Sequence, residues 1–396
     1  MLNPLYPAYS CTEGPTEELI EEIIQTTSGI LSIIGSGLIV LDVLRKLFTA
    51  KNGLNRTDPY QRIMLGLSFF DIILSFFDHV MGTLMTPKET GWLMAIGNEA
   101  TCTAQGFFIA FGFMGSFGYQ TALSLNILLL ISFGWSQKRF ARTVEIPMHI
   151  FIFVVSLTYG IIPLPLKSYN PACGQCLWGP LEYECNDPDG ELCVARGSQR
   201  VGFICGQLFW AAIWIMIIFC TLAMIWIYMS VRRQEVRQSI YSFPGEETRD
   251  YHRESRRIRK ILLLYTVALY VCWGVPFIII EATEYQDSTP FAVRAVIETL
   301  IPLIGFFNML VYFLPNSLTY QEAHPGTWLV VSYWYILIPQ SKGCGLLCSK
   351  LFTNYSTSGD DVTDEAIMES SDLSFAMHNI SHNTETRVLS SLSDDQ

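Results

Sequence analysis

The chain has 396 residues, of which 50% are hydrophobic, 13% are aromatic and only 15% are charged. This composition is unusual for a water-soluble globular domain and is typical of a protein whose surface mostly faces lipid. The formal net charge of −11 arises from the predicted outer face and the C-terminal tail, so it gives no reason to expect a nucleic-acid partner.

Seven apolar segments follow one another along the chain, each long enough to cross a bilayer. A hydrocarbon core of about 30 Å needs roughly 20 helical residues. The segments lie at about 24–49, 61–86, 103–133, 146–166, 201–231, 258–282 and 293–315. They predict an all-α fold, a seven-transmembrane helix bundle over residues 23–315, after a short extracellular N-terminus at 1–22.

The distribution of Lys and Arg predicts the side of the membrane on which each loop lies. No Lys or Arg precedes Arg45, and the most basic loop lies between Arg232 and Lys260. Because basic loops stay in the cytoplasm, we expect the N-terminus outside the cell and the C-terminus inside. We expect no cleavable signal peptide. The sequence therefore predicts a multi-pass protein of the plasma membrane.

Most of the cysteines fall on the predicted outer side, where disulfides are stable. They are Cys11, Cys102, Cys173, Cys176, Cys185 and Cys193. Six cysteines allow fifteen full pairings, which the sequence alone does not resolve. We favour a bridge from Cys102, at the start of the third span, to Cys176, beside the aromatic Trp178. A zinc cluster in that loop is the alternative, which needs reduced thiolates. We expect no metal or cofactor.

Polar residues recur at helical spacing along the second span. They are Ser68, Asp71, Ser75 and Asp78. An ionised Asp71 at the membrane centre would cost at least about 2.5–3.5 kcal/mol, so this stripe should face the bundle interior. Asn126 of span three and Asn308 of span seven are expected partners. Two interpretations stay open, a sodium or proton site that biases a conformational change and a static hydrogen-bond network.

Acidic residues near the outer ends of three spans suggest a ligand site. Asp78 and Glu298 lie about two turns inside their helices, and Glu281 lies at the outer end of span six. We expect them to line a cavity open to the outside. Because the outer loops are also acidic, they favour a cationic or neutral extracellular ligand. A merely solvated outer face is the alternative.

Span six is interrupted by helix-breaking residues. Pro276 removes a backbone hydrogen bond and Gly274 permits close approach, directly after Trp273. Pro302 interrupts span seven in the same way. Helices broken near polar residues can act as hinges, which a signal transducer needs.

Four short motifs resemble the G-protein-coupled receptors, over about residues 20–320. They are the acidic motif Leu67–Asp71, the third-span Cys102, the segment Val271–Phe277, which is similar to CWxP with one extra residue, and the segment Gly305–Tyr312, which looks like GFFNxxVY. The chain lacks the Asp/Glu-Arg-Tyr motif at the end of span three. It therefore resembles a divergent, cyclic-AMP-receptor-like or secretin-like lineage, although the acidic outer face argues against cyclic AMP as its ligand.

This resemblance implies a mechanism in which an extracellular ligand shifts an equilibrium between two helix packings. The implied switch residues are Asp71, Asn126, Trp273, Pro276, Asn308 and Tyr312. A heterotrimeric G protein would contact the basic inner ends, at Arg232, Arg233, Arg256, Arg257, Arg259 and Lys260. The alternative is that these charges set the topology and bind anionic lipid.

The C-terminal part contains no further span. Within residues 316–352, the aromatic run 328–338 is too short to cross a membrane and predicts an interfacial segment. Cys344 and Cys348 are candidate palmitoylation sites or simple reduced thiols. Residues 353–396 should be disordered and phosphorylated, for kinase or arrestin-like regulators, or else a plain solvated tail.

Other functions are less consistent with the sequence. A transporter or channel is the main alternative, but the spans show no internal repeat. A retinal photoreceptor would need a Lys in span seven, and residues 291–320 contain none. An enzyme would need clustered catalytic or metal-ligating side chains, and only His79 and His149 approach the membrane region. We therefore predict that the chain is not an enzyme.

Overall fold

The computed structural model describes residues 15–49, 57–172, 174–178, 197–241, 263–283, 290–324 and 326–337. Several predictions fall outside these residues. They concern Cys11, Cys173, Cys185, Cys193, Arg256, Arg257, Arg259, Lys260, Cys344, Cys348 and the tail at 353–396.

Long helices account for the predicted spans. They are α1 (Pro15–Thr49), α3 (Pro59–Leu74) with its continuation η1 (Ser75–Val80), α4 (Glu99–Phe133), α6 (Ile146–Ile161) after the short α5 (Gln137–Phe140) and η4 (Ala141–Glu145), and α7 (Gln199–Tyr241). Span six comprises the helical residues 263–269, η5 (Tyr270–Gly274) and α9 (Val275–Thr283). Span seven comprises α10 (Phe291–Leu300) and α11 (Ile304–Ala323).

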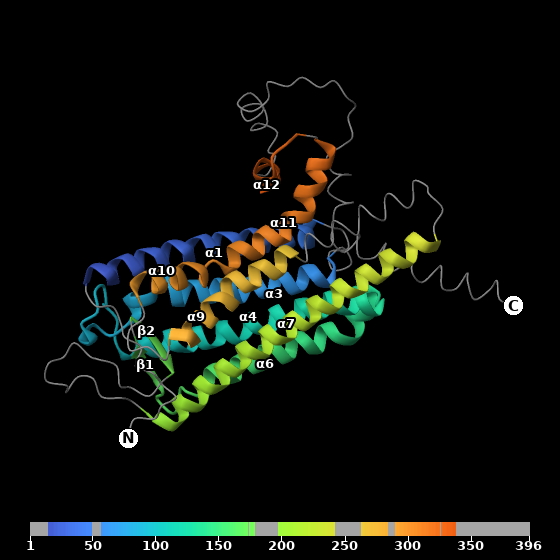
Figure 1. Cartoon of the computed structure of the whole chain (residues 1–396). Helices are drawn as coiled ribbons and strands as arrows, with labels where there is room; N and C mark the ends of the chain where they lie inside the picture. The colour runs from blue at the N-terminus through green and yellow to red at the C-terminus, as the bar shows by residue number, and fades with distance from the viewer. Residues whose placement is uncertain are drawn as a thin grey trace.

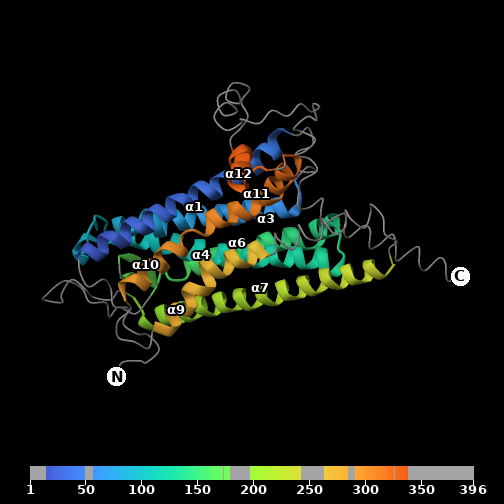
Figure 2. The ribbon, with the colours of Figure 1, turned by 45° about the horizontal axis from the view of Figure 1, so that its top comes forward.

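Within the described residues, six helices are long and apolar enough to cross a membrane. The pair α10 and α11, bent by 44° relative to each other, makes a seventh span. The helices lie side by side as an elongated bundle in which α4 packs against α3, α6 and α7 (Figures 1 and 2). The predicted all-α, seven-transmembrane helix bundle is therefore confirmed, and the chain is a multi-pass membrane protein.

Close helix contacts depend on residues without a side chain. A Cβ on Gly115 of α4 would lie 1.9 Å from the Phe70 ring of α3. A Cβ on Gly35 of α1 would lie 2.8 Å from the Phe306 backbone of α11. Small residues at these crossings let the backbones approach, which is how helices associate in lipid.

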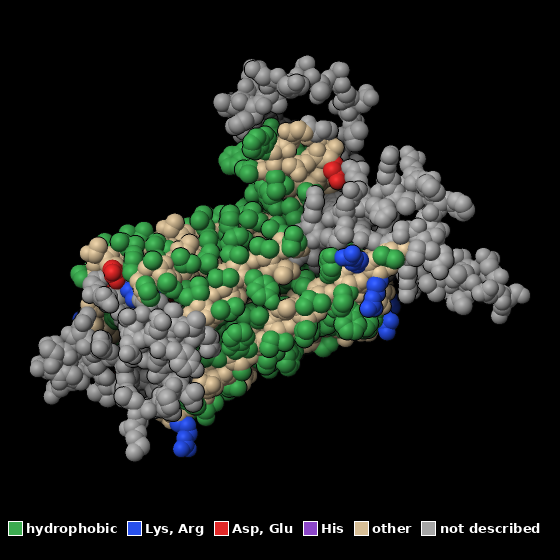
Figure 3. Space-filling view, viewed as in Figure 1, with side chains coloured by type: hydrophobic (Ala, Val, Ile, Leu, Met, Phe, Trp, Pro, Cys, Tyr) green, Lys and Arg blue, Asp and Glu red, His purple; other side chains and the backbone are tan. Residues whose placement is uncertain are grey.

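The ends of the bundle differ chemically from its side. On the face drawn in Figure 3, hydrophobic side chains cover the length of the bundle, whereas charged side chains lie toward the ends. We call the end with Cys102 the outer end and the end with Arg232 the inner end, following the orientation that the charge pattern predicts. Two buried hydrophobic clusters fill these halves, one around Trp273 in the outer half and one around Tyr312 in the inner half.

Several helix boundaries differ from the predicted spans. α1 begins at Pro15, so residues 15–22 of the predicted extracellular segment continue the first helix. Proline is favourable in the first turn, because a backbone N–H at that position has no partner within the helix. Glu17 and Glu18 follow it, and their negative charge complements the helix dipole. At the inner end, α7 continues to Tyr241, and α11 continues to Ala323 with Pro315 inside it.

A small β-hairpin adds to the helices at the outer end. Strand β1 (Tyr169–Ala172) pairs antiparallel with β2 (Gln175–Trp178), and Tyr169 lies opposite Trp178. The turn contains Gly174 at φ +77°, a conformation that glycine adopts without strain. The sequence analysis predicted no strand here.

The predicted interfacial segment forms the nine-residue helix α12 (Leu329–Leu337). Its Trp328 flank and Val330 are 79% and 77% exposed. On the other side, the Tyr333 hydroxyl donates to the Leu310 carbonyl of α11 at 2.5 Å. The helix therefore packs on α11 with one face and offers an apolar face outward, as a segment at the membrane surface would.

Candidate functional site

Asp71 is fully buried at the centre of the bundle and joins three spans. Its Oδ1 accepts a hydrogen bond of 2.7 Å from Ser116 Oγ of α4. Its Oδ2 accepts one of 2.8 Å from Asn308 Nδ2 of α11. The expected partnership with Asn308 is confirmed, whereas Ser116 was missed because many serines occur in the spans and none is singled out by sequence.

The expected partnership with Asn126 is wrong. Asn126 is fully buried, yet neither atom of its amide has a hydrogen-bond partner within the described part of the chain. The reason is its position along α4. Ser116 lies level with Asp71, and ten further residues of helix carry Asn126 about 15 Å toward the inner end. Two residues of one helix can therefore lie at different depths in the membrane.

The whole polar stripe of the second span faces the interior as predicted. Its four members are buried, at Ser68, Asp71, Ser75 and Asp78. Ser75 Oγ donates to Ser32 Oγ of α1 at 3.0 Å, and the Gly305 amide of α11 donates to the same Ser32 oxygen at 3.0 Å. The stripe thus ties spans one, two and seven together beside Asp71.

Trp273 lies at the break in span six. It is 1% exposed, and its ring contacts Phe113 and Phe117 of α4 at 5.8 and 4.9 Å between centroids and stacks on Phe277 at 5.7 Å. The one extra residue before Pro276 is accommodated by the π-helical turn η5. A π turn inserts a residue without breaking the helix, so Trp273 still faces the core.

Inner to this break, span six is attached to span three. The Tyr265 hydroxyl donates to the Gln120 carbonyl of α4 at 3.1 Å and lies 3.3 Å from Ser124 Oγ. Trp273 contacts Phe117 of α4, which adjoins Ser116, the hydrogen-bond partner of Asp71. The break, the Asp71 cluster and this attachment are therefore neighbours in the bundle core.

Tyr312, the last residue of the GFFNxxVY-like segment, lies in the inner half. Its hydroxyl donates to Asp42 Oδ2 of α1 at 2.7 Å, and Lys46 pairs with the same carboxylate at 3.2 Å. The Lys46 ammonium also lies 5.9 Å from the Tyr312 ring centroid. Asp42 was not singled out by the sequence analysis, although an acid four residues before a Lys inside an apolar span was a usable signal.

The predicted outer acids differ in burial. Asp78 is 3% exposed, whereas Glu298 of α10 is partly exposed. The side chain of Glu281 lies outside the described residues. The contribution of α1 was not predicted: Glu21 accepts from Arg294 of α10, and Glu22 accepts from Thr83.

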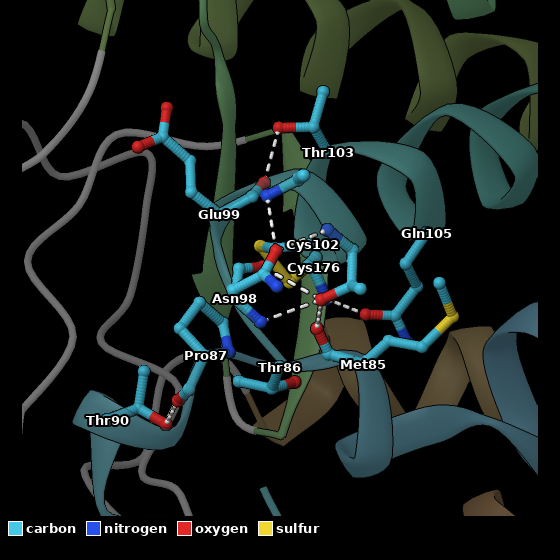
Figure 4. The surroundings of a disulfide bond; sticks show 12 residues. Met85, Thr86, Pro87, Thr90, Asn98, Glu99, Cys102, Thr103, Gln105 and Cys176 are labelled. Carbon is cyan, nitrogen blue, oxygen red and sulfur yellow. Dashed lines mark hydrogen bonds between the residues drawn. A yellow bond between two sulfur atoms is a disulfide. The ribbon is translucent and has the colours of Figure 1, made fainter. Parts of the chain in front are cut away.

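The disulfide between Cys102 and Cys176 is present in the structure, as favoured from the sequence. Figure 4 shows it beside Asn98, which caps α4, and beside Gln105. Gln105 is fully buried, donates to the Gly82 carbonyl at 2.8 Å and accepts from the Cys176 amide at 3.1 Å. These bonds hold the hairpin against the outer ends of spans two and three.

The hairpin also packs on the outer ends of spans four and five. Trp178 contacts the Tyr159 and Phe209 rings at 5.3 and 5.2 Å. The Tyr169 hydroxyl donates to the Gly160 carbonyl at 2.7 Å, and burial raises the pKa of Tyr169, so this hydroxyl remains a donor at neutral pH.

An ion pair at the inner end was also missed by the sequence analysis. Arg62 of α3 donates through both Nε and Nη2 to the Glu145 carboxylate, at 2.8 Å for Nη2. Glu145 also lies 3.8 Å from His149 Nε2, and His149 Nδ1 lies 2.7 Å from the Tyr119 hydroxyl of α4. This network joins spans two, three and four where the Asp/Glu-Arg-Tyr motif is lacking.

Two of the residues expected to contact a partner lie in the described part of the inner end. Arg232 and Arg233 of α7 are both exposed there. No group of three or more metal-ligating side chains occurs among the described residues.

Comparisons with known proteins support the fold. No protein-family model matches the sequence, and no curated protein matches it. Among solved structures, the crystal structure of squid rhodopsin is similar, with a TM-score of 0.52 and 15% sequence identity, over 90% of this chain and 92% of that one. At that identity the likeness shows the fold alone, which is a rhodopsin-like seven-helix bundle.

Proposed function

We propose that this protein is a receptor of the plasma membrane that passes an extracellular signal to a heterotrimeric G protein and is not an enzyme. The observation that carries the proposal is the arrangement around Asp71. A buried acid joins spans two, three and seven beside a broken span six. The rhodopsin-like fold supports the same function at the level of architecture.

The mechanism is a shift between two helix packings. A ligand that reaches the outer half changes the packing around Trp273, and span six bends at Pro276. The inner half of span six then leaves α4, so the bonds of Tyr265 to Gln120 and Ser124 break. The ligand drives this change by as much as its affinities for the two packings differ.

The Asp71 cluster acts as the switch in this scheme. Asp71 holds Asn308 of span seven, and Tyr312 holds Asp42 of span one, so span seven carries the change inward. We also assign Asn126 to the switch, although it does not bind Asp71. Among the described residues its buried amide has no hydrogen-bond partner, which costs about 1–3 kcal/mol, and a second packing that satisfies it would recover this energy.

The ligand site lies in the outer half, at Asp78 and Glu298. Glu281, at the outer end of span six in the sequence, belongs to the same site. The excess of acid favours a cationic or neutral ligand. At the inner end, Arg232 and Arg233, with Arg256, Arg257, Arg259 and Lys260, contact the G protein and anionic lipid. Palmitoyl groups at Cys344 and Cys348 add a membrane anchor, and kinase or arrestin-like regulators bind the tail.

We further propose a divergent lineage akin to the cyclic-AMP-receptor-like and secretin-like receptors. The segment Gly305–Tyr312 supports this placement. The ion pair of Arg62 and Glu145 supports it as well, because it joins the inner ends of the helices by means other than an Asp/Glu-Arg-Tyr motif.

The test is nucleotide exchange on a panel of purified heterotrimeric G proteins by the full-length protein in nanodiscs. Tyr265→Phe should raise basal exchange, because it removes the hydroxyl that ties span six to α4. Asp71→Asn and Trp273→Ala should alter exchange with surface expression largely intact. Tyr335→Phe, which removes a tyrosine hydroxyl of α12 outside span six, is the matched control.

Two results would overturn the proposal. One is the absence of exchange on every G protein by both the wild type and Tyr265→Phe. The other is an ion current or substrate uptake in proteoliposomes, which would identify a channel or transporter.

A further inference from the structure

Span seven is broken between α10 and α11. Residues 301–303 separate the two helices and include Pro302, which has no backbone N–H to donate to the preceding turn. The two helices are bent by 44° relative to each other at this point. Because Pro302 removes a backbone hydrogen bond across the break, the outer half of the span can pivot there.

The inner half of span seven is fixed by hydrogen bonds from its first turn inward. α1 is unbroken and lies along both halves of the span (Figure 1). At the break, the Gly305 amide of α11 donates to Ser32 Oγ of α1 at 3.0 Å. An amide in the first turn of a helix has no partner within that helix, so α1 supplies one. Further inward, Asn308 and Tyr312 of α11 donate to carboxylates of α3 and α1.

The outer half, α10, is attached to α1 by a charged contact. Arg294 donates from Nη2 to Glu17 Oε2 at 3.0 Å and from Nε to Glu21 Oε1 at 2.9 Å. Glu17 and Glu21 are four residues apart and so lie on one face of the helix. The Arg294 side chain is 13% exposed, and those of Glu17 and Glu21 are 34% and 16% exposed. This ion pair, which we call the outer clasp, therefore keeps some contact with water.

The α1 side of the outer clasp is itself anchored. Glu18 Oε1 accepts from the Leu93 amide at 2.5 Å, and Glu22 Oε2 accepts from Thr83 Oγ1 at 2.7 Å. Both partners belong to the segment between spans two and three. Because the first turns of α1 are held there as well, α10 is the side that moves when Arg294 is released.

α10 leads from the outer clasp to the break in span six. It packs against α9 and η5. Ile297 of α10 is buried in the same hydrophobic cluster as Trp273 and Phe277. A change in the tilt of α10 therefore alters the packing around Trp273.

We propose that the outer clasp is a releasable restraint on the outer half of span seven. With the clasp closed, α10 keeps the observed tilt. With the clasp open, α10 pivots about Pro302 while α11 stays in place. An ion pair near the outer surface suits this role, because salt screens it far more than the buried bonds of α11. The restraint itself does not depend on the proposed receptor function, whereas an effect of the clasp on signalling does.

The test is amide hydrogen exchange of the purified full-length protein in nanodiscs, measured separately for α10 and α11. Arg294→Gln should raise the exchange rate of α10 by roughly tenfold, which lies between the effects of losing an exposed and a buried ion pair. It should leave the exchange of α11 unchanged. Arg200→Gln, which removes an exposed cation at the outer end of α7, is the matched control and should change neither helix.

The carboxylates provide a second arm of the test. Glu17→Gln combined with Glu21→Gln should raise the exchange of α10 as Arg294→Gln does. Adding Arg294→Gln to this double variant should change little more, because the three side chains act as one unit. In the wild type, exchange of α10 should also rise as NaCl is raised from about 0.05 M to about 1 M. This salt series keeps the test decisive if a variant does not fold.

Three results would overturn the proposal. They are a wild-type exchange rate of α10 in Arg294→Gln, equal acceleration of α10 and α11, and a wild type whose α10 does not respond to salt.

The two proposals fail in different ways. Faster exchange of α10 in Arg294→Gln, without nucleotide exchange on any G protein, leaves the outer clasp and removes the receptor function. Nucleotide exchange on a G protein, with α10 unaffected by Arg294→Gln, leaves the receptor function and removes the outer clasp.

Discussion

The ion pair between Arg62 and Glu145 provides a sharp test of the inner end. The Glu145 side chain is 7% exposed, and Arg62 is 22% exposed. Breaking a fully buried pair costs about 3–5 kcal/mol, whereas exposed pairs contribute about 0–1 kcal/mol. Arg62 retains some water and also donates to the Thr57 carbonyl and hydroxyl. We therefore expect Glu145→Ala to lower the free energy of unfolding by about 2–3 kcal/mol.

The assay is a double-mutant cycle measured by unfolding in nanodiscs. Arg62→Ala alone should cost a similar amount, because it leaves a buried carboxylate. The double variant should be closer to either single variant than to their sum, with a coupling of about 2 kcal/mol. Arg142 is an exposed residue of η4, the π-helical turn that also contains Glu145. Arg142→Ala should change the free energy of unfolding by less than about 0.5 kcal/mol. Additive effects of Arg62→Ala and Glu145→Ala would refute the reasoning.

Three further predictions concern the bundle core and its outer end. Gly35→Ala should destabilise the protein because the new Cβ would lie 2.8 Å from the α11 backbone. Gly37→Ala should stabilise it by up to about 1 kcal/mol, because a Cβ there meets nothing within 4 Å. Equal thermal shifts for the two variants would contradict this. Asn308→Ala should cost about 1–3 kcal/mol in chemical unfolding because it leaves an Asp71 oxygen unpartnered, and a neutral effect would show that water replaces the amide. Cys176→Ser should cost about 2–5 kcal/mol by removing a disulfide between residues 74 apart, and reducing agent should shift the wild type more than the variant.

Much of the architecture was predictable because the membrane imposes it. A span must satisfy its backbone internally and present apolar side chains, so hydropathy alone located all seven spans. The buried polar stripe around Asp71 was predictable for the same reason, since a charged group cannot face lipid. The bridge between Cys102 and Cys176 was favoured for the oxidising outer side and an adjacent aromatic residue, although the sequence left the pairing open.

Depth along a helix was less predictable than the helix itself. The sequence placed Asn126 in the right span but about ten residues too far inward to reach Asp71, and Ser116 took its place. Register between neighbouring helices depends on close contacts such as the one at Gly115 with Phe70. A single sequence does not contain that information.

Contacts of charged residues at the membrane edge were not predicted. Glu17 to Glu22 lie in the predicted extracellular segment, and the structure adds that they continue α1 and contact Arg294 and Thr83. Glu145 was not singled out from the sequence, and it pairs with Arg62. In both cases two distant charges compensate each other, and hydropathy considers each charge alone.

The orientation of the bundle is the claim on which the account depends most. The most direct measurement is the accessibility of epitope tags at the two termini in intact and in permeabilised cells. The account predicts that antibody labels the N-terminal tag on intact cells and the C-terminal tag only after permeabilisation. Labelling of both tags, or of neither, on intact cells would contradict it, because the acidic outer site and the basic inner end would then not lie on opposite sides of one membrane.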